Sequence, residues 1–449
     1  MEAVLVIAGA VAIVWGAVLF LRGGLLAGCV AVIVAGTCFG YPFFHVPLSP
    51  VPLTIDRVLW VVLLAQYAVW RRFNLADPKP LRKAELALGL LYAVLLISLL
   101  AHDWRAHNAQ PASRFVFYYL MPFGMYWVAR QARLSARGML AADAVLGAFG
   151  IYLAFTALAE TQQISWLIFP KYISSPEYPE FFGRGRGPLL NPIGTGFFMS
   201  ACLYALAVGW PHVGRAGKAM IVAGATLIAA GLYATLTRSV WLGAGLGLMV
   251  ITAATLPRRW RMPVLGGTLI VVAIVAATQW ERFVAFKRDR DLGAHETAES
   301  VKLRPILARV AWNMFRDRPL FGCGFGHYRD ESINYLSDRS TDLPLEVARP
   351  YVQHNAFLGL LTETGLAGLV PWILVLVFWG HDAWRLWRSD SPLWARQQGL
   401  LLLAVLASYV VNAMFHDVSL IPMFHMLLFF VAGLAAAAYA VEREDRPAA

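Results

Sequence analysis

The sequence predicts an all-α integral membrane protein whose chain crosses the bilayer many times. Of its 449 residues, 59% are hydrophobic and only 14% are charged, whereas a soluble protein carries about 25% charged residues. Apolar runs of about 17 or more residues recur along the whole chain, and a helix of that length crosses the ~30 Å hydrocarbon core of a membrane. Strands of a membrane β-barrel would alternate between apolar and polar residues. The continuous runs therefore indicate helices.

Hydropathy divides the chain into thirteen expected spans. The first has no basic region before it and no small-residue cleavage site, so we expect a retained membrane helix. If all thirteen segments cross the membrane, the N-terminus lies outside. If the first two segments are not both full crossings, twelve crossings remain and the N-terminus lies inside. The Pro-rich stretch from Tyr41 to Pro52, a loop or a re-entrant turn, leaves both arrangements open. The expected spans cover about residues 2–21, 24–40, 55–70, 85–101, 113–130, 139–160, 189–210, 219–236, 239–256, 262–279, 353–380, 397–413 and 419–440.

Every second connection between these spans is basic, which by the positive-inside rule assigns it to the cytoplasm. These loops explain most of the net charge of +11, so we expect no nucleic-acid partner. The basic residues are Arg71, Arg72, Lys79, Arg82 and Lys83; Arg130, Arg133 and Arg137; Arg215 and Lys218; Arg258, Arg259 and Arg261; and Arg385, Arg388 and Arg396. The loops expected to face outward are 102–112, 161–188, 237–238, 280–352 and 414–418.

The long outward segment divides the chain into N-terminal membrane helices (1–279), an outer subdomain (280–352) and C-terminal membrane helices (353–449). Within the subdomain, Ser300 to Arg316 has the periodicity of a helix lying near the membrane surface. A Gly-rich turn, Pro319 to Gly326, follows it. The expected arrangement is therefore a bundle of about 12–13 membrane helices with one outward-facing loop subdomain of short helices.

His354 stands where this outward segment ends and an apolar helix begins. At helical spacing, His354, Leu358 and Leu361 share one face, so the imidazole lies at the watery end of an apolar stripe. Histidine exchanges a proton near neutral pH without a special environment. The position also suits an interfacial histidine that only anchors the helix.

Arginines stand out at the same outer face. Arg238 lies between two apolar runs with almost no loop, and Arg184 and Arg186 lie among glycines that let a backbone approach a ligand closely. Arg304 begins the surface helix, with Arg309 and Trp312 further along it. Each arginine taken alone also suits a snorkelling or solvated side chain. Together they form an anion clamp, because the guanidinium fork matches phosphate oxygens.

Cations that hold a diphosphate beside a residue that accepts a proton are what glycosyl transfer from a lipid diphosphate requires. The attacking hydroxyl needs a general base, and the departing diphosphate needs its negative charge stabilised. The prenyl chain of such a donor needs an apolar groove among membrane helices.

The run from Gln353 to Gly368, with Gln353-His354-Asn355 and the ten residues between His354 and Gly365, resembles the signature of the O-antigen ligase and O-antigen polymerase superfamily. Three further motifs resemble this family in the same order along the chain. They are Gly185-Arg186-Gly187 with Asn191-Pro192, Thr237-Arg238-Ser239, and the arginine-led helix from Arg304 with Trp312 and the turn Pro319-Leu320 to Phe325. In the ligases this arginine begins an R-x-x-x-L motif. Here Ala308 stands at the position of the leucine, which is a departure from the family pattern. The resemblance covers roughly residues 180–370.

The resemblance implies an inverting, metal-independent transferase outside the cytoplasmic membrane, with an undecaprenyl-diphosphate glycan as donor and a lipid A core sugar as acceptor. It implies neither a cofactor nor a metal, and we expect a monomer in the bacterial inner membrane with its site facing the periplasm. The expected catalytic residues are His354, Arg304 and Arg238. The expected substrate-binding residues are Arg184, Arg186, Asn355, Trp312 and Arg309.

Three alternatives stay open. A polymerase of O-antigen or exopolysaccharide and a protein O-oligosaccharyltransferase would share the fold, although only one outer loop is long and no large outer domain follows the last span. A transporter would place acids or broken helices in mid-span, and Asp143 is the one mid-span carboxylate noted. No Cys/His metal spacing or CxxC pair occurs, so neither a zinc site nor a structural disulfide is predicted.

Overall fold

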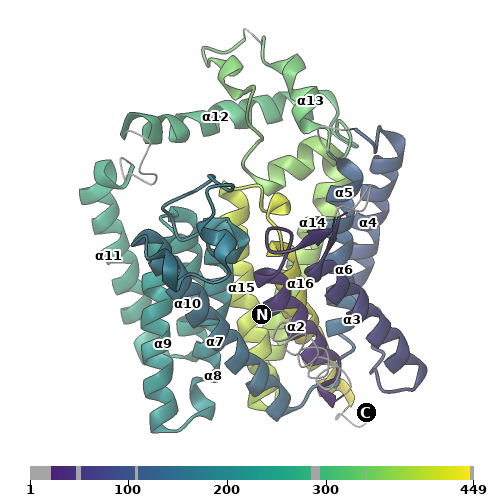
Figure 1. Ribbon diagram of the computed structural model, residues 1–449, viewed down its shortest axis with the longest axis vertical. Coiled ribbons are helices and arrows are strands. Elements are labelled where there is room, and N and C mark those ends of the chain that lie inside the picture. Colours follow the sequence, from purple (N-terminus) through teal and green to yellow (C-terminus); the bar gives the residue numbers. More distant parts are fainter. Residues whose placement is uncertain (1–21, 47–51, 107–109, 285–293, 339, 445–449) are drawn as a thin grey trace, which may run out of the picture.

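The computed structural model describes residues 22–46, 52–106, 110–284, 294–338 and 340–444, and these form a bundle of helices with almost no strand (Figure 1). Seven described helices are long and apolar enough to cross a membrane: α4, α7, α8 together with the short turn η5 (Trp210–His212), α9, α10, α14 and α15. The prediction of an all-α, multi-pass membrane protein is therefore confirmed. The expected span 2–21 lies outside the described residues.

The helices follow one another in chain order, and the two strands form a single antiparallel hairpin. The helices are α2 (Gly24–Cys38), α3 (Ile55–Arg72), α4 (Lys83–Ala101), α5 (Pro111–Phe115), α6 (Met121–Ala129), α7 (Ala136–Thr161), α8 (Pro192–Gly209), α9 (Arg215–Ala234), α10 (Arg238–Thr255), α11 (Arg258–Val284), α12 (Ala294–Asp317), α13 (Tyr328–Ser332), α14 (Ala356–Arg388), α15 (Leu393–Phe415) and α16 (Phe424–Glu444). The strands are β1 (His45–Val46) and β2 (Leu53–Thr54), and the short turns used below are η1 (Val116–Leu120), η7 (Leu345–Ala348) and η8 (Val418–Leu420).

Two expected spans differ from simple helices. The segment expected at 113–130 is divided into α5, the π-helical turn η1 and α6. The segment expected to begin at 353 begins at Ala356 and continues to Arg388 through a kink at Gly365. Hydropathy alone marks both segments as apolar, and it does not register a local change in hydrogen-bond pattern.

Small residues let the central helices pack closely, as is common between membrane helices. A Cβ added at Gly150 of α7 would lie 2.4 Å from the Cβ of Cys202 on α8, and one at Gly231 of α9 would lie 2.6 Å from Ala154 on α7. Aromatic rings fill the opposite side of the bundle, where Trp372 of α14 stacks on Phe429 of α16 at 6.0 Å between ring centroids. These contacts hold α7, α8, α9, α14 and α16 as one core.

Helices α12 and α13 lie across one end of the bundle, which we call the upper face (Figure 1). The helix predicted over Ser300 to Arg316 is present and is longer than expected, since α12 runs from Ala294 to Asp317. Its buried side chains, among them Ile306, Val310 and Met314, belong to a separate apolar cluster that includes Leu345 of η7. The outer segment therefore has its own small core above the membrane helices.

The five loops expected to share a face contact one another at the upper face. The backbone N–H of Phe325 donates to Ser98 Oγ at 3.0 Å, next to loop 102–112. Arg184 donates to Thr237 Oγ1 at 2.6 Å, which joins loop 161–188 to the turn before α10. Gln353 donates to Asp417 Oδ2 at 3.0 Å, which joins the outer subdomain to the last turn. The topology thus brings distant parts of the sequence to one end of the bundle.

Candidate functional site

His354 lies at the upper face, in the loop just before α14, with a backbone φ of +47°. The left-handed region costs a non-glycine residue about 1–2 kcal/mol, so its neighbours must hold it there. Gln353 Nε2 donates to Asp417 Oδ2 at 3.0 Å, and Asn355 Nδ2 donates to the carbonyl of Met414 at 3.0 Å. The residues on either side of the histidine are therefore tied to the end of α15 and to the turn that follows it.

Asn355 also begins α14. Its Oδ1 accepts from the backbone N–H groups of Phe357 and Leu358, both at 2.9 Å, as an N-cap residue does. The expected substrate-binding residue thus has a structural task that fixes where the helix begins and where His354 stands.

The surroundings of His354 favour its neutral form. Burial lowers the pKa of the imidazole, the positive charge of Arg304 lowers it further, and the carboxylate of Asp417 opposes both. The folded pKa therefore lies below the usual value near 6.5. At neutral pH the ring is unprotonated, which is the form that accepts a proton.

Arg304 reaches the same place from α12. Its guanidinium lies 4.9 Å from the ring centroid of Phe415, at the end of α15, and its charge acts on His354. A cation over an aromatic face is attracted by the negative face of the ring. The structure therefore brings Arg304, His354 and Asp417 together from three segments of the chain.

Arg238 is the first residue of α10. The next residue, Ser239, meets His416 with 3.0 Å between Oγ and Nε2, and His416 precedes Asp417. The beginning of α10 is thereby joined to the turn that also holds Gln353. Arg238 belongs to the same cluster of loops as Arg304 and His354.

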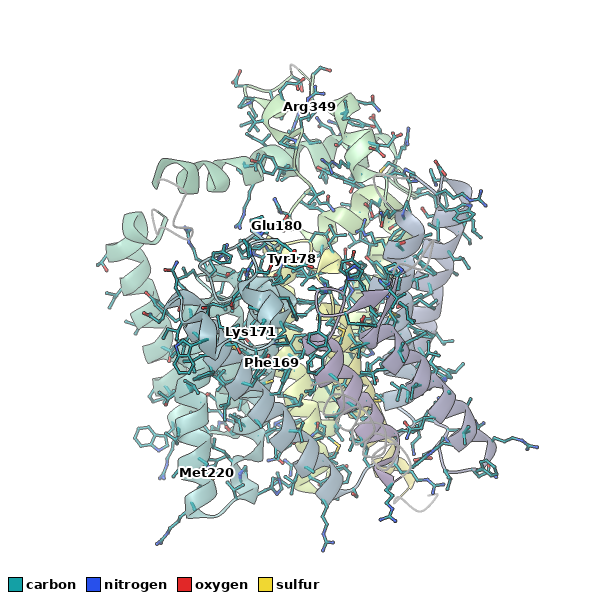
Figure 2. All side chains as sticks on the ribbon, viewed as in Figure 1. Phe169, Lys171, Tyr178, Glu180, Met220 and Arg349 are labelled. Atoms are coloured by element: carbon teal, nitrogen blue, oxygen red, sulfur yellow. The ribbon has the colours of Figure 1, made fainter. Side chains whose placement is uncertain are left out.

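Arg184 and Arg186 are largely engaged within the protein. Arg184, 4% exposed, donates from Nε to the carbonyl of Thr235 at 3.2 Å and holds the turn before α10. Arg186, 1% exposed, donates to Glu160 Oε1 at 3.3 Å and to the carbonyls of Ile173, Tyr178 and Glu180. Figure 2 shows Tyr178 and Glu180 on the upper part of the bundle, below Arg349 of the subdomain. Arg186 therefore organises loop 161–188 from inside.

Arg309 and Trp312 lie further along α12, in the outer subdomain. Arg309 donates to Ser340 Oγ at 3.2 Å and lies 3.8 Å from Asp338 Oδ2. Trp312 is 48% exposed and packs on Phe315 at 5.3 Å between ring centroids. These contacts of both side chains are with other residues of the subdomain and not with His354.

A buried ionic network that the sequence reading missed lies behind His354. Arg114 of α5 donates from Nη1 to both carboxylate oxygens of Glu363, at 2.7 and 2.8 Å, and from Nη2 to Ser419 Oγ at 3.0 Å. Its Nη2 also lies 3.6 Å from Asp417 Oδ2. Asp417 Oδ2 therefore lies near both Arg114 and Gln353. An arginine within an apolar segment was the available signal, because such residues are rarely there without a purpose.

The kink at Gly365 joins this network to the Gly-rich turn after α12. The N–H groups of Cys323 and Gly324 donate to the carbonyls of Thr362 and Glu363, both at 2.9 Å. In return the N–H groups of Leu366 and Ala367 donate to the carbonyls of Pro319 and Leu320, at 2.9 and 3.0 Å. The turn thus satisfies the backbone groups that the broken helix leaves free. This pairing explains why the two motifs occur together.

A cavity of about 720 Å³ is lined by Arg114 and by Leu420 of η8. Its walls combine polar side chains, among them Asp56, Arg57 and Gln110, with apolar ones such as Phe117 and Met426. Its size is in the range of ordinary ligand sites. Among the described residues, no group of three or more His, Cys, Asp and Glu side chains is arranged to hold a metal ion.

Residues 223–373 match the family model described as O-antigen ligase. The matched stretch contains Arg238, Arg304 and His354, together with the Gly-rich turn and the kink that it stabilises. No curated protein matches the chain.

Proposed function

We propose that the protein is a GT-C-like membrane glycosyltransferase that transfers a preassembled glycan from undecaprenyl diphosphate to a lipid A core sugar. The match of residues 223–373 to the O-antigen ligase family model supports this proposal. The observation that carries the proposal is the meeting of Arg304 and a neutral His354 at one face of the membrane bundle. The proposed location is the inner membrane of a bacterium, with this face toward the periplasm.

His354 acts as the general base. Its neutral imidazole takes the proton from the acceptor hydroxyl as the oxygen of that hydroxyl attacks C1 of the first sugar of the donor. The new C1–O bond forms on the face opposite the diphosphate, so the configuration at C1 inverts. The lowered pKa of His354 keeps the base unprotonated at neutral pH.

Arg304 and Arg238 stabilise the leaving group. As the bond between C1 and the diphosphate oxygen breaks, its electron pair passes to the diphosphate, and guanidinium groups stabilise that charge. Between the two remaining candidates, Arg184 and Arg186, the extensive internal bonds of Arg186 favour a structural role. The reaction needs no metal ion in this scheme, because the two arginines supply the positive charge.

The lipid chain of the donor and the acceptor lipid both remain in the bilayer while their polar ends meet at the upper face. The cavity beside η8 supports this arrangement by offering about 720 Å³ of mixed polar and apolar space. A polymerase would use the same base and the same leaving group with a second glycan as acceptor.

The test is transfer by purified protein in detergent, with an undecaprenyl-diphosphate saccharide and either lipid A core or no added acceptor. We expect transfer to lipid A core, and we expect it to survive EDTA. Chain growth without lipid A core would identify a polymerase. Absence of both products from folded protein, or strict dependence on Mg²⁺ or Mn²⁺, would contradict the proposal.

A further inference from the structure

A second cavity, of about 440 Å³, lies among α10, α11, α14 and α15. It is lined by three arginines, two tryptophans and small apolar side chains, namely Arg261, Arg388, Arg396, Trp384, Trp387 and the wall around Ala254. No acidic side chain of the described residues lines it. The cavity is therefore strongly positive.

This cavity is far from the proposed transfer site. Helix α14 begins at Ala356, beside His354, and ends at Arg388, and at about 1.5 Å per residue its 33 residues span roughly 50 Å. Helix α10 likewise begins at Arg238 on the upper face, and Ala254 lies at its other end. The arginine-lined cavity thus opens at the lower end of the bundle, where the basic loops gather.

Among the described residues, carbonyl groups and aromatic rings, and no carboxylate, contact these three arginines. Arg396 donates from Nε to the carbonyl of Trp387 at 3.0 Å and stacks over its ring at 5.1 Å. Arg261 donates from Nε to the carbonyl of Leu256 at 2.8 Å, and Arg388 lies over the ring of Trp384 at 5.7 Å. Backbone carbonyls and indole faces orient a guanidinium but leave its charge available.

We propose that this cavity binds the phosphate group of an anionic phospholipid. Three guanidinium groups fit phosphate oxygens, and basic pockets between membrane helices recognise acidic lipid headgroups. The two tryptophans suit the depth of the headgroups, and the apolar wall of Val250, Ala253 and Leu403 suits the first part of the acyl chains. This apolar wall favours a lipid over free phosphate, which would leave that surface uncovered.

The experiment measures the Tm of the detergent-solubilised protein with three probes: dioleoyl phosphatidylglycerol, zwitterionic dioleoyl phosphatidylcholine, and inorganic phosphate. A ligand that binds only the folded protein raises Tm. We expect phosphatidylglycerol to raise Tm well above the effect of phosphatidylcholine, and inorganic phosphate to raise it little. Added salt should reduce the effect of phosphatidylglycerol.

Arg388→Gln is the informative variant, because the guanidinium of Arg388 lies over the ring of Trp384 and, among the described residues, donates no hydrogen bond to the backbone. We expect it to weaken phosphatidylglycerol binding about fivefold, the usual effect of one arginine near an acidic headgroup, and Arg388→Gln with Arg396→Gln to weaken it further. Arg385→Gln is the matched control, because Arg385 carries the same charge in the same last turn of α14 but does not line the cavity.

Native mass spectrometry of the same samples counts the bound lipids and shows that each variant is folded. Equal loss of binding in Arg385→Gln and Arg388→Gln would overturn the proposal, because a general surface charge would then explain it. Equal stabilisation by inorganic phosphate and by phosphatidylglycerol would overturn the lipid assignment. Neither result depends on glycan transfer.

Discussion

The charge environment of His354 sets how the reaction should depend on pH. Because burial and Arg304 lower the pKa of the imidazole, the neutral base persists as the pH falls through about 6.5 and is lost only below the folded pKa. We expect the rate of transfer to stay constant from pH 8 to below about 6.5 and then to fall. A pH–rate profile that falls already above 6.5 would contradict this.

A substitution of Asp417 tests directly how neighbouring charges change the pKa of His354. Its carboxylate raises the pKa of His354, so Asp417→Asn should shift the acid limb of the profile to lower pH. Asp338→Asn is the control, because Asp338 pairs with Arg309 and Asn313 in the outer subdomain. An acid limb that moves upward in Asp417→Asn, or equally in both variants, would show that Asp417 does not act through the imidazole.

Arg304→Lys tests whether the fork geometry of the guanidinium matters. A lysine keeps the charge but cannot make two parallel contacts to a diphosphate, and one charged hydrogen bond contributes about 1.5–3 kcal/mol. We therefore expect roughly a 10- to 100-fold lower rate of transfer. Arg309→Lys on the same helix, whose arginine pairs with Asp338, should keep near-normal activity. Normal activity of Arg304→Lys would place its guanidinium outside the reacting groups.

The sequence identified the candidate site residues that belong to motifs, but it did not identify Arg114, which belongs to no motif. His354, Arg304 and Arg238 were identified from position and resemblance, and the structure brings their segments together. Arg114 was included in the apolar span expected at 113–130. Its partners Glu363 and Asp417 lie 249 and 303 residues away, so nothing in the local sequence indicates the ion pair. A pair so distant in sequence becomes visible only when the helices are assembled.

The kinked helix α14 depends on glycine at position 365. Its φ of +62° and ψ of −159° belong to a region that only glycine occupies, at a cost of about 1–3 kcal/mol for other residues. A Cβ there would also lie 2.4 Å from the backbone of Leu320. Gly365→Ala should therefore lower Tm clearly and lower transfer activity with it.

Gly245→Ala is the matched control for that substitution. Gly245 lies in α10 with no atom within 4 Å of an added Cβ, and alanine favours a helix over glycine. Its Tm should stay equal or rise slightly. A Gly365→Ala protein as stable as Gly245→Ala would mean that the helix is not broken there.

The sequence predicted where the long helices lie better than it predicted the kinks and irregular turns within them. Long apolar segments gave α7, α9 and α10 within a few residues, because hydropathy reports burial in lipid directly. The kink at Gly365 and the π-helical turn η1 depend on backbone groups being satisfied by other segments, and local composition does not encode such partners.

The buried network around Arg114 connects the whole molecule, since it joins α5, α14 and the turn before α16. Arg114→Gln leaves the carboxylates of Glu363 and Asp417 without their cation, and breaking a buried ion pair costs about 3–5 kcal/mol. We expect a large loss of Tm. Arg133→Gln, at an exposed arginine bonded to the carbonyl of Asn74, should change Tm little.

The double variant Arg114→Gln with Glu363→Gln separates this explanation from a general loss of packing. Removing one of the unpaired carboxylates should restore part of the stability lost in Arg114→Gln, because less negative charge remains buried. A double variant less stable than Arg114→Gln alone would mean that the ionic contact is not what the network contributes.

The overall arrangement followed from charge alternation between spans. The loops assigned to one side because they alternate with the basic loops lie together at the upper face, and the basic cavity lies at the other end. What the sequence could not supply is which of these loop residues touch, because that depends on how the helices pack around one another.

The most direct measurement of the central claim is the rate of glycan transfer by His354→Ala beside wild-type protein, with Tm confirming that both are folded. If His354 is the general base, its removal should lower the rate by about 10²- to 10⁴-fold while leaving membrane insertion and Tm nearly unchanged. A folded His354→Ala protein that transfers glycan within a few-fold of the wild-type rate would contradict the account.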